Sequence, residues 1–453
     1  MRTMPCKFAG GTTAALLLRA ALLLFLFLFV VHLCPAYSVL THEEIVDLLW
    51  KDQIQPLLKK RFPDATEEDL RKAHAYAYGG SLVQDMGYYP FGNKHFSDLL
   101  HYVRSGDFTV ILIQESSDLN EFAFALGALS HYAADNSGHP TINRAVTIEF
   151  PKLAKKYGER ATYADDPKAH IRTEFGFDMV QVAKNRYTSD RYHDFIGFEV
   201  SKELLDRAFL KTYGLKLDDV FGSTDLAIGT FRRSISIVIP EMTRVALLAR
   251  KQSIVADTPN FNKKKFLYYL SRKDYEKEWG KGYRKPGCGT RVLAFFLRLM
   301  PKVGPFSALA FKIPTQRTED MYIKSVDLTV EDYSKLLHDT RIQELRLPNK
   351  DCDTGLDTRP GEYALTDKAY ERLLDKLADK KFENLTPQLQ ENILEFYADL
   401  KAPFWTKSDK KAWTRTLANL EQLRAATPVA TEQPVKTTQG GSPSIQELPK
   451  HPQ

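Results

Sequence analysis

Apolar side chains recur every three or four positions along most of the chain, which predicts amphipathic and buried α-helices. The strongest pattern covers 117–134 and predicts a buried helix that ends near Gly138. Similar patterns cover 169–183, 201–210 and 226–251, and no long run alternates with a period of two. We therefore predict an all-α fold.

Two helix starts carry capping sequences. Thr41 and Glu44 fit a capping box, with Thr41 as N-cap and Glu44 reaching back to it. Thr66 begins a second helix in the same way, with acidic residues near its positive dipole end, and this helix runs towards Gly79–Gly80. Asp85 follows these glycines, so we expect it in a loop.

The N-terminus has the order of a secretory signal. Basic residues up to Arg19 precede an apolar run over 20–33, and small residues allow cleavage after Ala36 or after Ser38. We predict that residues 1–36 are a signal peptide and that the protein is exported, either secreted or periplasmic. An uncleaved N-terminal membrane anchor is the alternative.

The remaining chain divides by composition. We predict a helical domain over 37–257, because 256–290 becomes rich in lysine, aromatic residues and glycine. A second, mostly helical region follows over 258–425. The tail 426–453 is rich in Thr, Pro, Gln, Gly and Ser, has few apolar side chains to offset its ordering entropy, and is predicted to be disordered.

Charge and cysteine content narrow the choice of partners. Removing the signal peptide deletes three positive charges and no acids, so the net charge falls from +6 to +3, which disfavours nucleic acid. Cys288 and Cys352 remain after processing and could pair, which the sequence leaves open. The apolar run 291–311 could rest on a membrane surface, although a buried helix broken at Pro301 is the commoner arrangement.

Histidine placement points to metal chemistry. His131 with Asp135, and His170 with Glu174, are each four residues apart, so on a helix each pair faces one way and can hold one ion. A single such pair is usually a solvated surface pair, but two pairs favour a zinc site. Seven of the 11 histidines lie between 42 and 170, where surface histidines would scatter more evenly: His42, His74, His95, His101, His131, His139 and His170.

The ordered set resembles the zinc-dependent phospholipase C family, whose wider relatives include the glycosylphosphatidylinositol-specific phospholipase D and a group of zinc nucleases. The resemblance covers roughly residues 37–200 and rests on the order of the set, which begins just after the export signal. That set is His42, Asp85, His95, His131, Asp135, His139, His170 and Glu174.

The resemblance implies three zinc ions in an all-helical domain. His95, His131 and Asp135 would hold the first, and Asp135 would bridge to a second that is held by His42. The family also uses the mature N-terminal residue as a ligand, which favours cleavage after Ala36 and makes Tyr37 that ligand.

The resemblance further assigns His139, His170 and Glu174 to the third zinc. It gives Asp85 the role of the carboxylate that orients or deprotonates the attacking water. His139 follows Asp135 two positions sooner than in the family pattern. His101 could replace His95 as ligand, and we prefer His95 because His-Phe followed by an acid fits the family better.

Tyr88, Tyr89 and Phe91 follow Asp85 and could form an aromatic wall that contacts a headgroup or a base, although such residues are more often core. A later acidic run, Asp351, Asp353, Asp357 and Glu362, echoes a calcium loop but lacks its glycine at position six, so we interpret it as an acidic turn.

These features predict an exported trizinc phosphodiesterase, most closely a phospholipase C that cleaves a phospholipid headgroup bond. A nuclease or other phosphodiesterase is the first alternative. A zinc-stabilised surface or interaction module without catalytic activity is the second.

Overall fold

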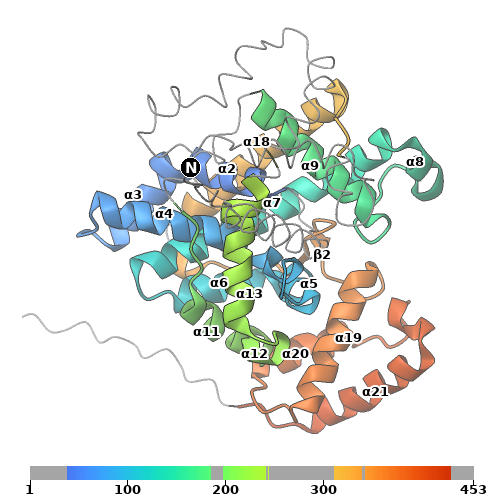
Figure 1. Cartoon of the computed structure of the whole chain (residues 1–453). Coiled ribbons are helices and arrows are strands. Elements are labelled where there is room, and N and C mark those ends of the chain that lie inside the picture. Colours follow the sequence, from blue (N-terminus) through green and yellow to red (C-terminus); the bar gives the residue numbers. More distant parts are fainter. Residues whose placement is uncertain (1–37, 185–196, 241–242, 244–310, 339–341, 430–453) are drawn as a thin grey trace, which may run out of the picture.

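A computed structural model describes residues 38–184, 197–240, 243, 311–338 and 342–429. In this part of the chain helices dominate, and the only strands are β1 (Lys350–Asp351) and β2 (Leu356–Asp357), which pair antiparallel with Lys350 opposite Asp357. The predicted all-α class is confirmed (Figure 1). No helix within these described ranges is both long and apolar enough to cross a bilayer.

Several sequence-based predictions fall outside the described residues. They are the signal peptide with Tyr37, the domain boundary near 258, residues 291–310 of the apolar run, the tail from 430, and Cys288. Cys352 is described, and its thiol is buried and free.

The N-terminal half contains the helices that position the candidate site. They are α2 (Val39–Leu49), η1 (Trp50–Ile54), α3 (Gln55–Arg61), α4 (Glu67–Ser81), η2 (Val83–Tyr88), α5 (Lys94–Tyr102), α6 (Ser105–Glu115), α7 (Leu119–Glu149), α8 (Pro151–Tyr157) and α9 (Pro167–Ala183). Four described helical segments follow: α11 (Lys202–Tyr213), α12 (Leu217–Val220), α13 (Thr224–Arg233) and η3 (Ser234–Val238).

The long helix α7 crosses α4 at very short range. A Cβ atom on Gly127 of α7 would lie 2.0 Å from the carbonyl oxygen of Ala77, and one on Gly80 of α4 would lie 1.9 Å from that of Phe124. Only glycine lets two backbones approach this closely. The crossing sets the end of α4, at Ser81, beside the buried face of α7.

The helix predicted to end near Gly138 continues to Glu149, so that boundary was wrong. Pro140 lies inside the helix and cannot donate to the carbonyl of Asn136 four residues earlier. Gly355 of the β1–β2 turn packs against that carbonyl, and a Cβ there would come within 2.5 Å of its oxygen. Tertiary packing thus overrides the local stop signals.

The two predicted capping boxes had different outcomes. At α4 the box is present: Thr66 accepts from the Asp69 amide, and the Asp69 carboxylate accepts from Thr66. At α2 the prediction was wrong, because the helix begins at Val39 after Ser38. Thr41 is instead buried and donates its hydroxyl proton to Asp178 of α9 at 2.5 Å.

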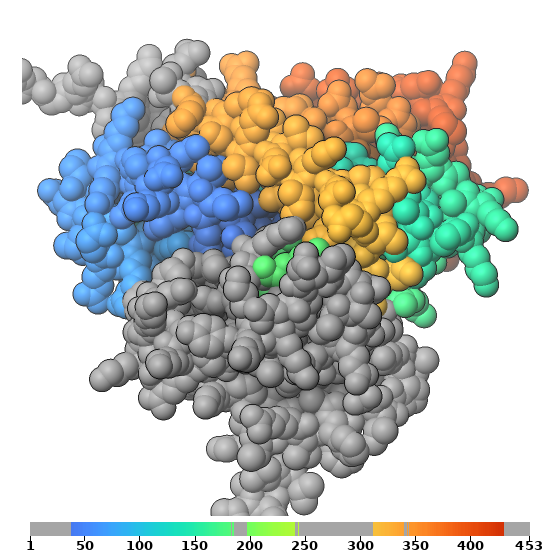
Figure 2. Space-filling view, turned by 90° about the horizontal axis from the view of Figure 1, so that it is seen from above, coloured from blue at the N-terminus to red at the C-terminus, as the bar shows by residue number. Residues whose placement is uncertain are grey.

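The C-terminal part packs on the same core. Its described elements are α18 (Gln316–His338), η5 (Ile342–Glu344), α19 (Ala364–Asp379), α20 (Pro387–Phe396), η6 (Trp405–Ser408) and α21 (Lys410–Ala425). In Figure 2 the yellow-orange atoms of α18 lie against the blue N-terminal helices. Tyr322 of α18 stacks on Phe177 with ring centroids 4.4 Å apart, and its hydroxyl lies 2.6 Å from the Thr41 hydroxyl.

The β1–β2 turn docks next to α5. The amide of Cys352 donates to the carbonyl of His101 at 3.1 Å, and the hydroxyl of Ser105 donates to the carbonyl of Lys350 at 2.6 Å. Residues that are 245 or more positions apart in the sequence are thereby neighbours at the candidate site.

Candidate metal centre

Five helical segments of the N-terminal half, α2, η2, α5, α7 and α9, carry a set of buried titratable side chains. The set divides into three groups whose ligand atoms lie within 4.8 Å of one another: His42 with His131 and Asp135; Asp85 with His101 and His131; and His139 with His170 and Glu174. Every member is at most 1% exposed. Burying so many ionisable groups is costly unless they are paired or hold a cation.

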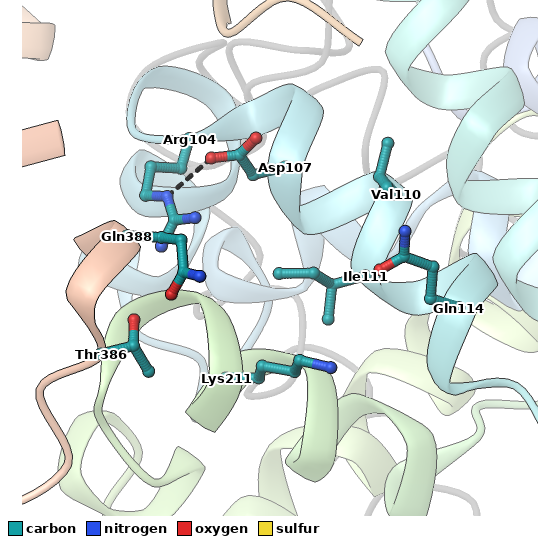
Figure 3. Close-up of a pocket in the computed structure, with 8 residues that line it drawn as sticks. All are labelled: Arg104, Asp107, Val110, Ile111, Gln114, Lys211, Thr386 and Gln388. Atoms are coloured by element: carbon teal, nitrogen blue, oxygen red, sulfur yellow. Dashed lines mark hydrogen bonds and ion pairs between the residues drawn. The ribbon is translucent and has the colours of Figure 1, made fainter. Parts of the chain in front are cut away.

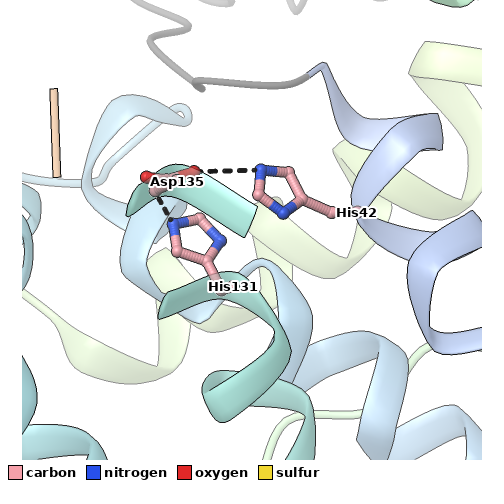
Figure 4. A group of neighbouring side chains, drawn as sticks. All are labelled: His42, His131 and Asp135. Atoms are coloured by element: carbon pink, nitrogen blue, oxygen red, sulfur yellow. Dashed lines mark ion pairs between the residues drawn. The ribbon is translucent and has the colours of Figure 1, made fainter. Parts of the chain in front are cut away.

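Asp135 links the first two groups, and Figure 4 shows its contacts with His42 and His131. Its Oδ1 atom lies 3.5 Å from Nε2 of His42, and its Oδ2 atom lies 3.2 Å from Nε2 of His131 and 3.3 Å from Nε2 of His101. Each carboxylate oxygen therefore faces a different set of imidazoles. This is the arrangement that a carboxylate bridging two ions requires.

The structure places His101, and not the preferred His95, in this cluster. His101 Nε2 lies 3.4 Å from Oδ1 of Asp85 and 3.4 Å from Nε2 of His131. His95 belongs to none of the three groups. Burial, followed by the nearby Lys376 and Arg372, lowers the pKa of His95 to about 3. Because positively charged side chains lie near this ring, binding of a zinc ion to it is unfavourable. The preference for His95 over His101 as a ligand is therefore corrected.

Three of the histidines are oriented by backbone carbonyls. His131 Nδ1 lies 2.8 Å from the carbonyl oxygen of Ser81, and His101 Nδ1 lies 2.8 Å from that of Ser97. His139 Nδ1 contacts the carbonyl of Cys352. With Nδ1–H donating to a carbonyl, Nε2 is the ring atom left to coordinate an ion, which is how metal-binding histidines are usually held.

The third group joins α7 to α9. His170 Nε2 lies 2.7 Å from Oε1 of Glu174, as expected for residues four apart on one helix, and the rings of His139 and His170 have centroids 5.4 Å apart. The predicted His170–Glu174 pair is thus formed, and His139 reaches it despite its shorter distance from Asp135 in the sequence.

The electrostatics of the cluster favour cation binding. Burial lowers the pKa of His42 and His139 and brings that of His170 to about 4, so these rings are neutral and able to coordinate. Burial also raises the pKa of Asp85 and of Glu174, because it disfavours the charged form of a carboxyl group. A divalent ion would remove this penalty.

The spacing of the donors around Asp135 and Asp85 fits zinc, whereas Nε2 of His170 and Oε1 of Glu174 in the third group lie 2.7 Å apart, at ion-pair distance. Zinc bonds of 2.0–2.2 Å in a tetrahedron separate neighbouring ligand atoms by about 3.3–3.6 Å. The nitrogen–oxygen distances around Asp135 and Asp85 are 3.2–3.5 Å. Imidazole nitrogens combined with carboxylate oxygens are also zinc's usual donors where cysteine is absent.

The predicted aromatic wall is only partly formed. Tyr88 is buried beside the cluster, with its ring centroid 6.0 Å from that of His101, and it packs against Tyr163, whose ring lies 6.0 Å from that of His170. Tyr89 packs on Phe231 in the core. Phe91 is exposed, in a left-handed backbone conformation. Sequence reasoning missed Tyr163.

Sequence reasoning also missed Asp353, which lies beside His139. The signal that could have found it is the acidic run around Cys352.

A separate pocket of about 230 Å³ opens between α6, α11 and the start of α20 (Figure 3), and none of its lining residues is a candidate ligand. Arg104, one of the residues that line this pocket, donates hydrogen bonds to the carboxylate of Asp107 and to the carbonyl of Thr212.

Comparison with known families agrees with this geometry. Residues 41–221 match the family model described as zinc dependent phospholipase C, a stretch that contains all three ligand groups. No curated protein and no solved structure matches the chain significantly. The region over 41–221, which contains Asp135 and the buried histidines, therefore belongs to the zinc-dependent phospholipase C family.

Proposed function

We propose that this protein is an exported hydrolase that cleaves the headgroup phosphodiester bond of a phospholipid, with three zinc ions held by the buried cluster. The family domain supports phospholipase C-type chemistry in general. The observation that carries the proposal is Asp135, whose two oxygens face separate sets of imidazoles and so can join two ions. Bound zinc ions lower the pKa of water and neutralise charge on phosphate oxygens.

Asp85 is the residue that orients or deprotonates the attacking water in this proposal. Neither of its carboxylate oxygens has a hydrogen-bond partner within the described structure, and it is almost fully buried. Burial raises the pKa of Asp85, which makes it a stronger proton acceptor than a surface aspartate. Its Oδ1 atom points at His101, so a single bound ion beside His101 would also fix the carboxylate.

Asp85→Asn separates the role of base from that of ligand. As a base, Asp85 contributes about 10²–10⁴-fold to the rate, so the variant should lose that factor in kcat while it keeps its zinc. A variant with full activity would refute the base assignment. A variant that loses a zinc ion would make Asp85 a ligand instead.

Tyr88 and Tyr163 provide the surface against which the headgroup would lie. They form a small apolar cluster between His101 and His170, with Ile171 and Leu365 packed against it. Aromatic faces attract quaternary ammonium groups, which favours a choline headgroup over a neutral one.

The proposal is tested on the mature protein by metal analysis and hydrolysis together. We expect about three zinc ions per chain, and turnover of phosphatidylcholine vesicles that stops on chelation and returns with zinc. Faster turnover of a chromogenic phosphodiester than of vesicles would favour another phosphodiesterase. Zinc without any turnover would favour a binding module.

Export is tested at the N-terminus. Cleavage after Ala36 would make Tyr37 the first residue and place its amine next to Ser38, which precedes the helix that carries His42. N-terminal sequencing of the mature protein should therefore find Tyr37. Any other first residue would eliminate the amine ligand and leave the zinc ligands from side chains intact.

A further inference from the structure

The third metal group has a carboxylate neighbour that comes from outside the family domain. Asp353 lies in the turn between β1 and β2, more than 130 residues beyond the stretch that matches the family model. Its side chain is completely buried. Its Oδ1 atom lies 3.6 Å from Nε2 of His139.

The two oxygens of Asp353 are in different situations. Oδ2 accepts hydrogen bonds from the hydroxyl of Tyr102 at 2.8 Å and from the hydroxyl of Tyr363. Oδ1 has no hydrogen-bond partner within the described structure and faces His139. A buried carboxylate oxygen without a donor is costly, and one tied at its second oxygen by outer hydrogen bonds is typical of a metal ligand.

The turn is fixed so that this oxygen keeps its direction. Asn143 of α7 donates its side-chain amide to the carbonyl of Asp353 at 2.8 Å, and His139 Nδ1 contacts the carbonyl of the preceding Cys352. The turn therefore orients both partners: it holds the Nδ1 side of His139 and presents a carboxylate to the Nε2 side. Among the described residues, Nε2 of His139 also has no hydrogen-bond partner.

Asp353 is not one of the three donors that all lie within 4.8 Å of one another, and the donor that its Oδ1 atom faces is Nε2 of His139. We propose that Oδ1 of Asp353 completes this group as a fourth protein ligand when the ion is bound, beside His139, His170 and Glu174. The 3.6 Å between Oδ1 and Nε2 lies at the upper end of the about 3.3–3.6 Å expected between ligand atoms on one tetrahedral zinc. Four protein ligands close a zinc site, whereas a catalytic zinc keeps an open position. The third ion would then fasten the C-terminal region to the family domain, and water activation would belong to the groups around Asp135.

This inference rests on the part of the proposed function that states that the protein binds zinc. Its test measures zinc binding and not hydrolysis. Asp353→Asn should weaken binding of the most affected zinc by at least about 10-fold in a competitive chelator titration, because a charged ligand is lost. In the cobalt-substituted protein the visible absorption of that site should also change. The other two sites should keep their wild-type affinities, which shows that the domain is folded.

Two further variants serve as matched controls. Asp357→Asn removes the same charge at an exposed position of β2 and should bind zinc like the wild type. Asp351→Asn weakens the bond from the Asp353 amide to Oδ1 of Asp351 but leaves the Asp353 carboxylate in place, so it should lose much less affinity than Asp353→Asn.

The outcomes are distinct. Wild-type affinities and an unchanged cobalt spectrum in Asp353→Asn would overturn the inference and leave the proposed function standing. Equal losses in Asp351→Asn and Asp353→Asn would also overturn it, because the effect would belong to the shape of the turn. A wild-type protein without zinc would overturn the proposed function itself.

Discussion

At the scale of single residues, His95 and His101 differ in the charge that surrounds each ring. His101 lies between the carboxylates of Asp85 and Asp135, whereas His95 is close to Lys376 and Arg372. Replacing His101 with alanine should lower the affinity of the affected zinc by more than about 100-fold, since changes in outer hydrogen bonds alone cost 10–100-fold. Zinc counted by mass spectrometry after dialysis should fall in this variant.

His95→Ala is the matched control, because the two histidines lie on one helix and are both buried. It should retain the full zinc complement even if its stability changes. A loss of zinc in His95→Ala with none in His101→Ala would reverse the assignment.

The pKa of His101 also predicts how zinc binding depends on pH. Burial alone would lower this pKa, but the close, negatively charged carboxylates of Asp135 and Asp85 raise it well above 6.5. The ring is therefore protonated at neutral pH in the metal-free protein, and zinc must displace that proton. Affinity should rise with pH between about 6 and 8, with proton release on binding.

Calorimetry in buffers of different ionisation enthalpy measures the released protons. His95→Ala should release as many as the wild type, and His101→Gln should release fewer. Binding that is independent of pH across this range in the wild type would show that His101 is neutral before zinc arrives.

At the scale of elements, the crossing of α4 and α7 sets the position of the cluster. Gly127→Ala would place a Cβ atom 2.0 Å from the Ala77 carbonyl, so the helices must separate. Such overpacking costs about 1–3 kcal/mol, and it should also move Ser81 away from His131 and weaken zinc binding. Chemical denaturation with and without zinc measures both effects.

Gly229 in α13 is the control for the same substitution. No atom of the described part of the chain lies within 4 Å of a Cβ atom placed there, and the residue is inside a helix. Gly229→Ala should therefore stabilise the protein by up to about 1 kcal/mol. If Gly127→Ala were equally harmless, the close crossing would have no energetic importance.

Helical spacing predicted part of this arrangement and missed the rest for identifiable reasons. The pairs His131–Asp135 and His170–Glu174 follow from the helical repeat, and the structure forms both. His95 and His101 are six residues apart and so lie on different faces of α5, and only tertiary packing decides which face meets α7. Asp353 lies in a turn that packs against helices far earlier in the sequence. No local sequence pattern predicts that contact.

At the scale of the whole molecule, the metal cluster joins segments that are distant in sequence. His42, the α7 residues and the α9 residues come from three helices, and the β1–β2 turn is bonded to His101 and contacts His139. A ligand that binds only the folded state stabilises it by RT ln(1 + [L]/Kd), about 4 kcal/mol for each site at a thousandfold excess over Kd. Removing zinc should therefore lower the thermal midpoint strongly.

Hydrogen exchange can locate that loss within the fold. The Cys352 amide, which donates to the carbonyl of His101, should exchange faster after chelation, together with the ends of α4 and α5 that orient the site histidines. Helix α21 packs against α19, α20 and η6, away from the helices that carry the cluster, and should keep its protection until global unfolding. Equally faster exchange in α21 and around Cys352 would mean that zinc acts on global stability alone. Unchanged exchange at Cys352 would mean that hydrogen bonds from the tyrosine and asparagine side chains hold the turn without help from a metal.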